Sequence, residues 1–87
     1  MASTVDQFQL EMPDGRSFEG SAVAIVSQMR ALAFDREPSL DSYIRWSAET
    51  ARVHLGVELS TEGESLEALA ENFLASVVRA GLARKTD

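Results

Sequence analysis

The sequence predicts a small α+β fold in which an N-terminal β-hairpin packs on three α-helices. Three observations indicate this fold. An alternating apolar and polar segment precedes a turn triplet, three later segments carry apolar residues at helical spacing, and 87 residues suit one small domain spanning 1–87. The expected order of elements is β-β-α-α-(β)-α, in which the strand in parentheses is optional.

The hairpin is predicted from the alternation between Val5 and Met12 and from the triplet Pro13-Asp14-Gly15. Proline and glycine supply the backbone angles of a tight turn, after which Arg16–Glu19 can return as a second strand. A two-stranded hairpin is only marginally stable alone, and its two open edges can accept a third strand or a second chain. We therefore expect its apolar face to lie on the helices: Phe8, Leu10, Met12 and Phe18.

The first two helices are expected at Ala22–Phe34 and Leu40–Leu55. Ser21 and Ser39 precede them as N-caps, Pro38 interrupts the segment between them, and Gly56 follows the second helix as a left-handed C-cap.

A third helix is expected from Leu66 to about Ala80, closed by a Schellman-type turn at Gly81-Leu82. The segment Val57–Leu59 alternates and is equally consistent with a short third strand or an extended linker. Residues 1–4 and 83–87 are expected to be frayed.

Composition limits the chemistry. The chain has no cysteine and one histidine, so neither a zinc site nor a thiol nucleophile can be assembled, and no glycine spacing matches a nucleotide-binding loop. We expect no metal, no cofactor and no catalytic residues. A net charge of −6 disfavours nucleic acid and anionic membranes as direct partners. Without a signal-like or membrane-spanning segment, we expect a soluble cytoplasmic protein.

His54 is the residue on which an enzyme hypothesis depends. Ser47, Thr50 and His54 follow one another by about a turn of helix, so a Ser-His relay can be drawn, but one helix surface provides no oxyanion pocket. We interpret His54 as a packing or helix-end residue and do not expect an enzyme. A small acid-base enzyme using His54 is the remaining exception.

The apolar arc of the helix at 40–55 is wider than one contact requires. Trp46, Thr50 and Val53 lie together beside its main apolar stripe, and Tyr43 bridges the two; these four are the interface candidates. Either this helix is central and covered on both sides, or these residues form an exposed interface. Our first hypothesis is a protein-protein interaction module, homodimeric, that uses this helix face and an open hairpin edge.

A second hypothesis follows from the acidic charge. Five glutamates follow the helix at 40–55 and could mask a basic nucleic-acid-binding surface on a partner protein: Glu58, Glu62, Glu64, Glu67 and Glu71. The alternative is a solvated loop leading into a helix N-terminus.

Overall fold

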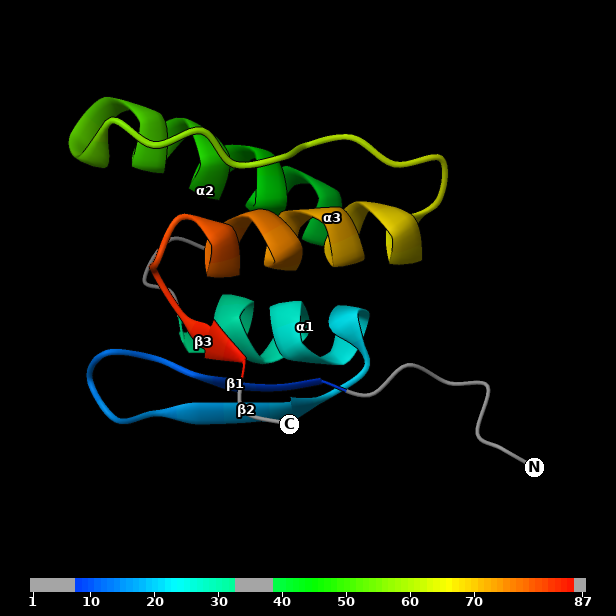
Figure 1. The fold of residues 1–87 in the computed structure, drawn as a ribbon. Helices are drawn as coiled ribbons and strands as arrows, with labels where there is room; N and C mark the ends of the chain where they lie inside the picture. Colours follow the sequence, from blue (N-terminus) through cyan, green and yellow to red (C-terminus); the bar gives the residue numbers. More distant parts are fainter. Residues whose placement is uncertain (1–7, 33–38, 86–87) are drawn as a thin grey trace.

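The computed structural model describes residues 8–32 and 39–85 and has an α+β fold, as predicted (Figure 1). A three-stranded antiparallel sheet and three helices follow one another in the order β-β-α-α-α-β. The elements are β1 (Phe8–Glu11), β2 (Ser17–Gly20), α1 (Ala22–Leu32), α2 (Leu40–Leu55), α3 (Leu66–Arg79) and β3 (Arg84–Lys85).

The predicted hairpin is confirmed as β1 and β2, which pair with Leu10 opposite Phe18. In the turn, the Gly15 N–H donates to the Met12 carbonyl over 3.0 Å, and the Met12 N–H donates to the Arg16 carbonyl over 2.7 Å. Gly15 has a φ of 95°, which glycine adopts without the steric cost that a side chain brings. Leu10 and Phe18 face the core, so the predicted apolar face is correct at these two positions.

The third strand does not lie where the sequence analysis placed it. Val57–Leu59 is not a strand; instead Arg84–Lys85 forms β3 on the free side of β1, with Lys85 opposite Leu10 and Glu11 opposite Arg84. The expected frayed tail is therefore wrong at 83–85. Ala83 is buried among core residues, and the Arg84 guanidinium pairs with the Glu11 carboxylate. Residues 1–4, 86 and 87 lie outside the described residues.

The helix termini follow the predicted caps. Ser39 Oγ accepts the Ser42 N–H over 3.1 Å, Ser21 Oγ accepts the Ala24 N–H over 3.2 Å, and Gly56 ends α2 with a φ of 71°. At the end of α3, the Leu82 N–H donates to the Val77 carbonyl and the Gly81 N–H to the Val78 carbonyl, each over 3.0 Å. These two bonds are those of a Schellman motif. The predicted positions 33 and 34 of the first helix lie outside the described residues.

The core lies where α1 meets the sheet and the other two helices. In Figure 1, α1 lies over the hairpin, and α2 and α3 lie on the other side of α1. The largest fully buried side chains come from β1 and all three helices: Leu10, Ile25, Val26, Ile44, Phe73 and Leu74. One end of α2 extends past the end of α3, so its last turns are less covered than its centre (Figure 1).

The segment 56–65 connects α2 to α3 without regular structure and runs back past both helices (Figure 1). Two side chains of α3 hold it. The buried Ser76 hydroxyl accepts the Ser60 N–H over 2.9 Å, and the Asn72 amide donates to the Glu62 carbonyl over 2.7 Å. These bonds satisfy backbone groups that a third strand would otherwise have to pair.

Candidate functional site: an apolar groove beside α2

The four interface candidates on α2 have different environments. Tyr43 is buried, with 7% of its surface exposed, and belongs to the core. Trp46 is 37% exposed, Val53 is 61% exposed, and Thr50 is half-buried. The stripe is thus covered by the rest of the chain at Tyr43, as in a central helix, and exposed at Trp46 and Val53, as in an interface. Each of the two interpretations of the wide apolar arc holds for part of the helix.

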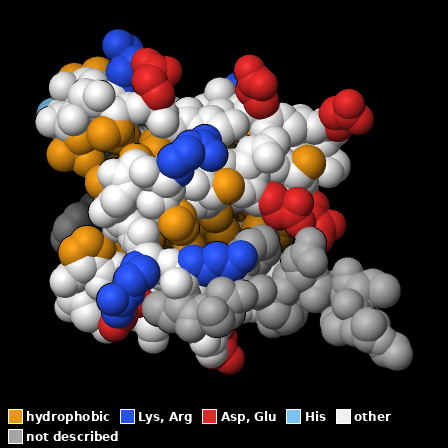
Figure 2. All heavy atoms as spheres, in the orientation of Figure 1, with side chains coloured by type: hydrophobic (Ala, Val, Ile, Leu, Met, Phe, Trp, Pro, Cys, Tyr) orange, Lys and Arg blue, Asp and Glu red, His pale blue; other side chains and the backbone are white. Residues whose placement is uncertain are grey.

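Trp46 and Thr50 line an open hollow of about 370 Å³ beside α2. Four more lining residues belong to α2 itself: Ser47, Ala51, His54 and Leu55. The other walls come from the hairpin turn, α1, the 56–65 segment, α3 and the turn after α3: Met12, Met29, Leu59, Phe73, Val77 and Leu82. Among the residues that the structure describes, no carboxylate, lysine or arginine lines it. In Figure 2, hydrophobic side chains gather at the left edge of the molecule, between the end of α2 and the hairpin turn.

A second hollow of about 290 Å³ adjoins the first and shares Met12, Met29 and Trp46 with it. It adds Leu32 at the end of α1, which is 54% exposed, and the charged Asp14 and Arg16 of the hairpin turn. We call the two hollows together the α2 groove. Trp46 lies between them, and its ring centroid is 6.0 Å from that of Tyr43, so a largely buried tyrosine supports the exposed indole.

Charged residues that line the second hollow, and others on the exposed side of α2, form ion pairs. On α2, Arg45 donates to Asp41 over 3.0 Å, and Arg52 pairs with Glu49. In the hairpin turn, Arg16 and Asp14 are 3.3 Å apart. An apolar centre with charged residues at its edge is the composition that protein interfaces favour.

His54 is exposed in the last turn of α2 and contributes to the lining of the groove. Ser47 and Thr50 line the same hollow, so the three residues of the drawn relay do lie on one side of the helix. Within the described residues, no hydrogen bond joins His54 to either hydroxyl. The enzyme exception based on His54 stays a prediction.

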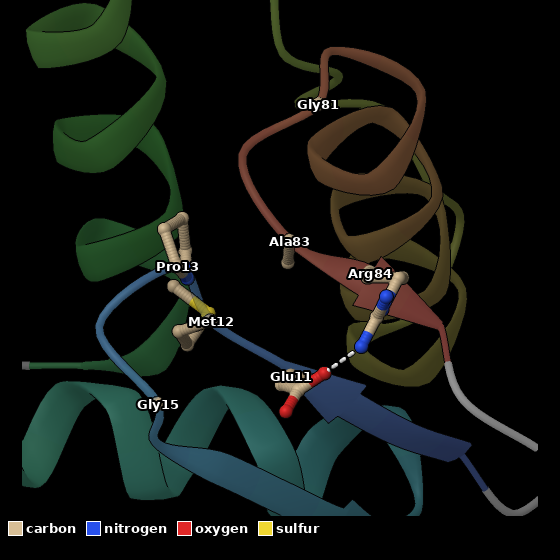
Figure 3. A pocket seen from close by; sticks show the side chains of 7 residues that line it. All are labelled: Glu11, Met12, Pro13, Gly15, Gly81, Ala83 and Arg84. Carbon is tan, nitrogen blue, oxygen red and sulfur yellow. Dashed lines mark hydrogen bonds and ion pairs between the residues drawn. The ribbon is translucent and has the colours of Figure 1, made fainter.

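A separate hollow of about 550 Å³ lies between the hairpin turn and the chain after α3 (Figure 3). Figure 3 shows the side chains of Glu11 and Arg84 pointing toward each other across it, joined by their ion pair. Because each of these charges already has its partner, the pair fastens β3 to β1 rather than offering an open binding group.

The five glutamates of the second hypothesis lie on the 56–65 segment and the first half of α3. Glu58, Glu62, Glu64 and Glu67 are exposed, and Glu71 is half-buried. Among the described residues none of the five is in an ion pair. Figure 2 shows acidic side chains along the upper and right edges of the molecule, and others beside Lys or Arg side chains at the upper left and lower left.

The structure adds groove residues that the sequence analysis did not assign to a site. Met12, Met29, Leu59 and Leu82 come from four different parts of the chain. Each fits a local pattern as a strand, helix, linker or cap residue, and only the tertiary arrangement brings them together. Over residues 8–32 and 39–85, no three His, Cys, Asp or Glu side chains are grouped as metal ligands would be. No helix in the same ranges has the length and apolar character needed to cross a membrane.

Comparison of the chain with protein-family models, with curated proteins and with solved structures finds no match.

Proposed function

We propose that this chain is a protein-protein interaction module that binds an apolar helix face in the α2 groove. The observation that carries this proposal is the exposure of Trp46 between two adjoining hollows, an apolar one and one whose edge carries Asp14 and Arg16. Tryptophan at the centre of an apolar patch is the residue that most often dominates binding energy at protein interfaces. The groove runs beside α2, which suits an elongated, helical partner surface.

A partner that buries the exposed apolar side chains of the α2 groove gains free energy. Leu32, Trp46, Val53 and Leu55 are each between about a third and two thirds exposed in and around the groove. Burying such a side chain completely contributes about 1.5–3 kcal/mol, so a partner that covers all four gains several kcal/mol before the cost of association. The open edge of the sheet is a weaker candidate than in the original hypothesis, because β3 already occupies one side of β1.

The second candidate function is an acidic regulator that masks a basic surface of a partner. It is supported by the five glutamates on residues 58–71, which lack ion-pair partners within the described residues. Their charge would attract lysine and arginine side chains of a nucleic-acid-binding protein. Such binding weakens steeply with salt, whereas binding in an apolar groove does not.

One experiment tests both candidates. The purified chain is immobilised, exposed to a lysate of its source cells at low and at high salt, and compared with Thr50→Arg, which places a charge in the groove. Thr61→Arg makes the same change of residue and charge outside the α2 groove, as the matched control. Circular dichroism establishes that each variant is folded.

We expect proteins, or further copies of the chain, that stay bound at high salt to the wild type and to Thr61→Arg and are lost with Thr50→Arg. Retention only at low salt, unaffected by Thr50→Arg, would favour the acidic regulator. If every protein retained at high salt bound Thr50→Arg as well as the wild type, the groove would not be the binding surface.

A further inference from the structure

We propose that the occupant of the α2 groove is a second copy of this chain, with the two α2 helices packed antiparallel about a two-fold axis. This inference rests on the proposed function and names its partner. Four features of α2 support it: the spacing and the sizes of the residues on its exposed stripe, the charges beside them, and the apolar area they leave open.

The stripe has the spacing of a helix-helix seam. Tyr43, Trp46, Thr50 and Val53 are separated by three, four and three residues, as are the first and fourth positions of successive heptads. Two helices that pack along such a seam cross at a shallow angle. The stripe from Trp46 to Val53 faces no other helix of the chain closely enough to bury it, since these two residues are 37% and 61% exposed.

The sizes of these residues favour a second, antiparallel α2. The two large aromatic residues lie in the N-terminal half of the stripe, and the two small β-branched residues lie in its C-terminal half. With the two-fold axis near position 48, Trp46 faces Thr50 of the second copy, and Tyr43 is level with its Val53. The exposed Trp46 side chain then meets a small one, as close packing requires, whereas Tyr43 stays buried in the core of its own chain. Parallel packing would instead set the two Trp46 side chains against each other.

Antiparallel packing of the two α2 helices brings no like charges together beside the seam. In the antiparallel pairing, Glu49 is level with Ser47 of the second copy and Arg45 is level with its Ala51, so no charge meets its like. The ion pairs Asp41–Arg45 and Glu49–Arg52 stay at the exposed side of α2, where they can form a polar rim. An isologous interface needs such a self-complementary patch.

The apolar area is of the size that a small stable dimer uses. A standard interface covers about 800 Å² on each partner, a little more than half of it apolar. Leu32, Trp46, Val53 and Leu55 leave on the order of 50–100 Å² each exposed, and the groove walls supply more. The second α2 would fill the space between the first α2 and the wall formed by Met12 and Met29.

The first test is the mass of the purified chain by sedimentation equilibrium over a range of concentrations. We expect a monomer-dimer equilibrium that is as tight or tighter at high salt, because screening reduces repulsion between two chains of net charge −6. Thr50→Arg should weaken dimerisation about tenfold or more, and Thr61→Arg should leave it close to that of the wild type. A chain that stays monomeric up to near-millimolar concentration would overturn the inference.

The second test is a size exchange between the two facing positions. Trp46→Thr leaves a gap and Thr50→Trp creates an overlap, so each variant alone should weaken the dimer. The double variant restores one large and one small residue in every facing pair, and we expect it to recover much of the lost affinity. A loss in the double variant equal to the sum of the losses in the two single variants would contradict direct contact between these positions.

The third test determines whether the two α2 helices are parallel or antiparallel. Because the chain has no cysteine, an introduced cysteine is its only thiol. Antiparallel packing separates the two copies of position 53 by about ten residues, or roughly 15 Å, along the helices. Val53→Cys should therefore not form a disulfide-linked dimer, whereas a mixture of Trp46→Cys and Thr50→Cys, the facing positions, should form the mixed disulfide. Rapid linkage of Val53→Cys to itself would show parallel packing and overturn the proposal.

These outcomes separate the inference from the proposed function. A monomeric chain that still captures another protein through a Thr50-dependent surface would refute self-association and keep the interaction module. A monomeric chain with no groove-dependent partner would refute both.

Discussion

Single residues fix the path of the segment between α2 and α3. A Cβ built at Gly63 would lie 2.3 Å from the backbone nitrogen of Leu69 and 2.6 Å from its Cα, so the segment approaches the start of α3 too closely for any side chain. Ser76 holds the same segment further along by accepting the Ser60 N–H. Glycine is required at 63 for close approach, whereas at Gly81 it is required for a φ of 82° in open space.

We predict that Gly63→Ala lowers the free energy of unfolding by about 2–4 kcal/mol, because the methyl group must displace backbone atoms. Gly81→Ala is the matched control. It meets no neighbouring atom within 4 Å and should cost only about 1–2 kcal/mol through its left-handed conformation. Urea unfolding of both variants measures the difference. Equal losses in the two variants would show that the segment moves away from α3 without cost.

At the scale of elements, the sequence was informative where the signal is local. The hairpin turn, the caps and the bounds of α2 depend on residues a few positions apart, and all three are confirmed. β3 could not be predicted this way. It has two residues, Arg84 and Lys85, with no alternation to read, and its partner strand lies more than seventy positions away in the sequence. Val57–Leu59 does alternate, but its neighbour Ser60 is bonded to a helix side chain instead of a strand.

The residues of the candidate site also differ in whether local sequence spacing or tertiary packing determines their exposure. Trp46, Thr50 and Val53 are identifiable from the spacing within one helix, and the structure leaves Trp46 and Val53 exposed. Tyr43 belongs to the same stripe but is buried, since the position of α1 and the hairpin decides which end of the stripe is covered. Helical periodicity predicts on which face of its helix a side chain lies, but it does not predict which other element packs against that face.

The C-terminal strand gives a prediction at the same scale. Ala83 is 7% exposed at the entrance to β3, so Ala83→Glu would bury a charge and is expected to lower the free energy of unfolding by about 3 kcal/mol. Ala75→Glu makes the same change at an exposed position of α3 and should stay within about 0.5 kcal/mol of the wild type. Thermal and urea unfolding provide the comparison. If both variants were equally stable, residues 83–85 would be a loose tail, as the sequence alone suggests.

At the scale of the whole molecule, the surface has an apolar groove and, outside the lining of that groove, a group of acidic side chains. The apolar α2 groove lies between α2 and the hairpin turn (Figure 2), and the glutamates of the 56–65 segment and the start of α3 are not among the residues that line it. A net charge of −6 on 87 residues makes the folded chain repel itself, and also keeps an exposed apolar groove from causing unspecific association. The negative charge would then oppose random contact while the complementary shape of the groove selects one partner.

Removing part of this charge should stabilise the chain. Glu58, Glu62 and Glu64 are exposed and have no ion-pair partner within the described residues, so the triple variant Glu58→Gln, Glu62→Gln and Glu64→Gln changes the net charge from −6 to −3 without breaking a pair. At low salt we expect a gain of about 0.5 kcal/mol in the free energy of unfolding, and a smaller rise of stability with added salt than in the wild type.

Glu49→Gln is the control for this prediction, because Glu49 is paired with Arg52 and its removal leaves that arginine without its partner on α2. It should give no gain. Urea unfolding at low and at high salt measures all three proteins. Dimerisation should respond in the same direction as stability, since the triple variant leaves the α2 groove intact and lowers the repulsion between two copies. A triple variant that was less stable than the wild type at low salt would mean that these glutamates have attractive contacts, and that self-repulsion does not limit the fold.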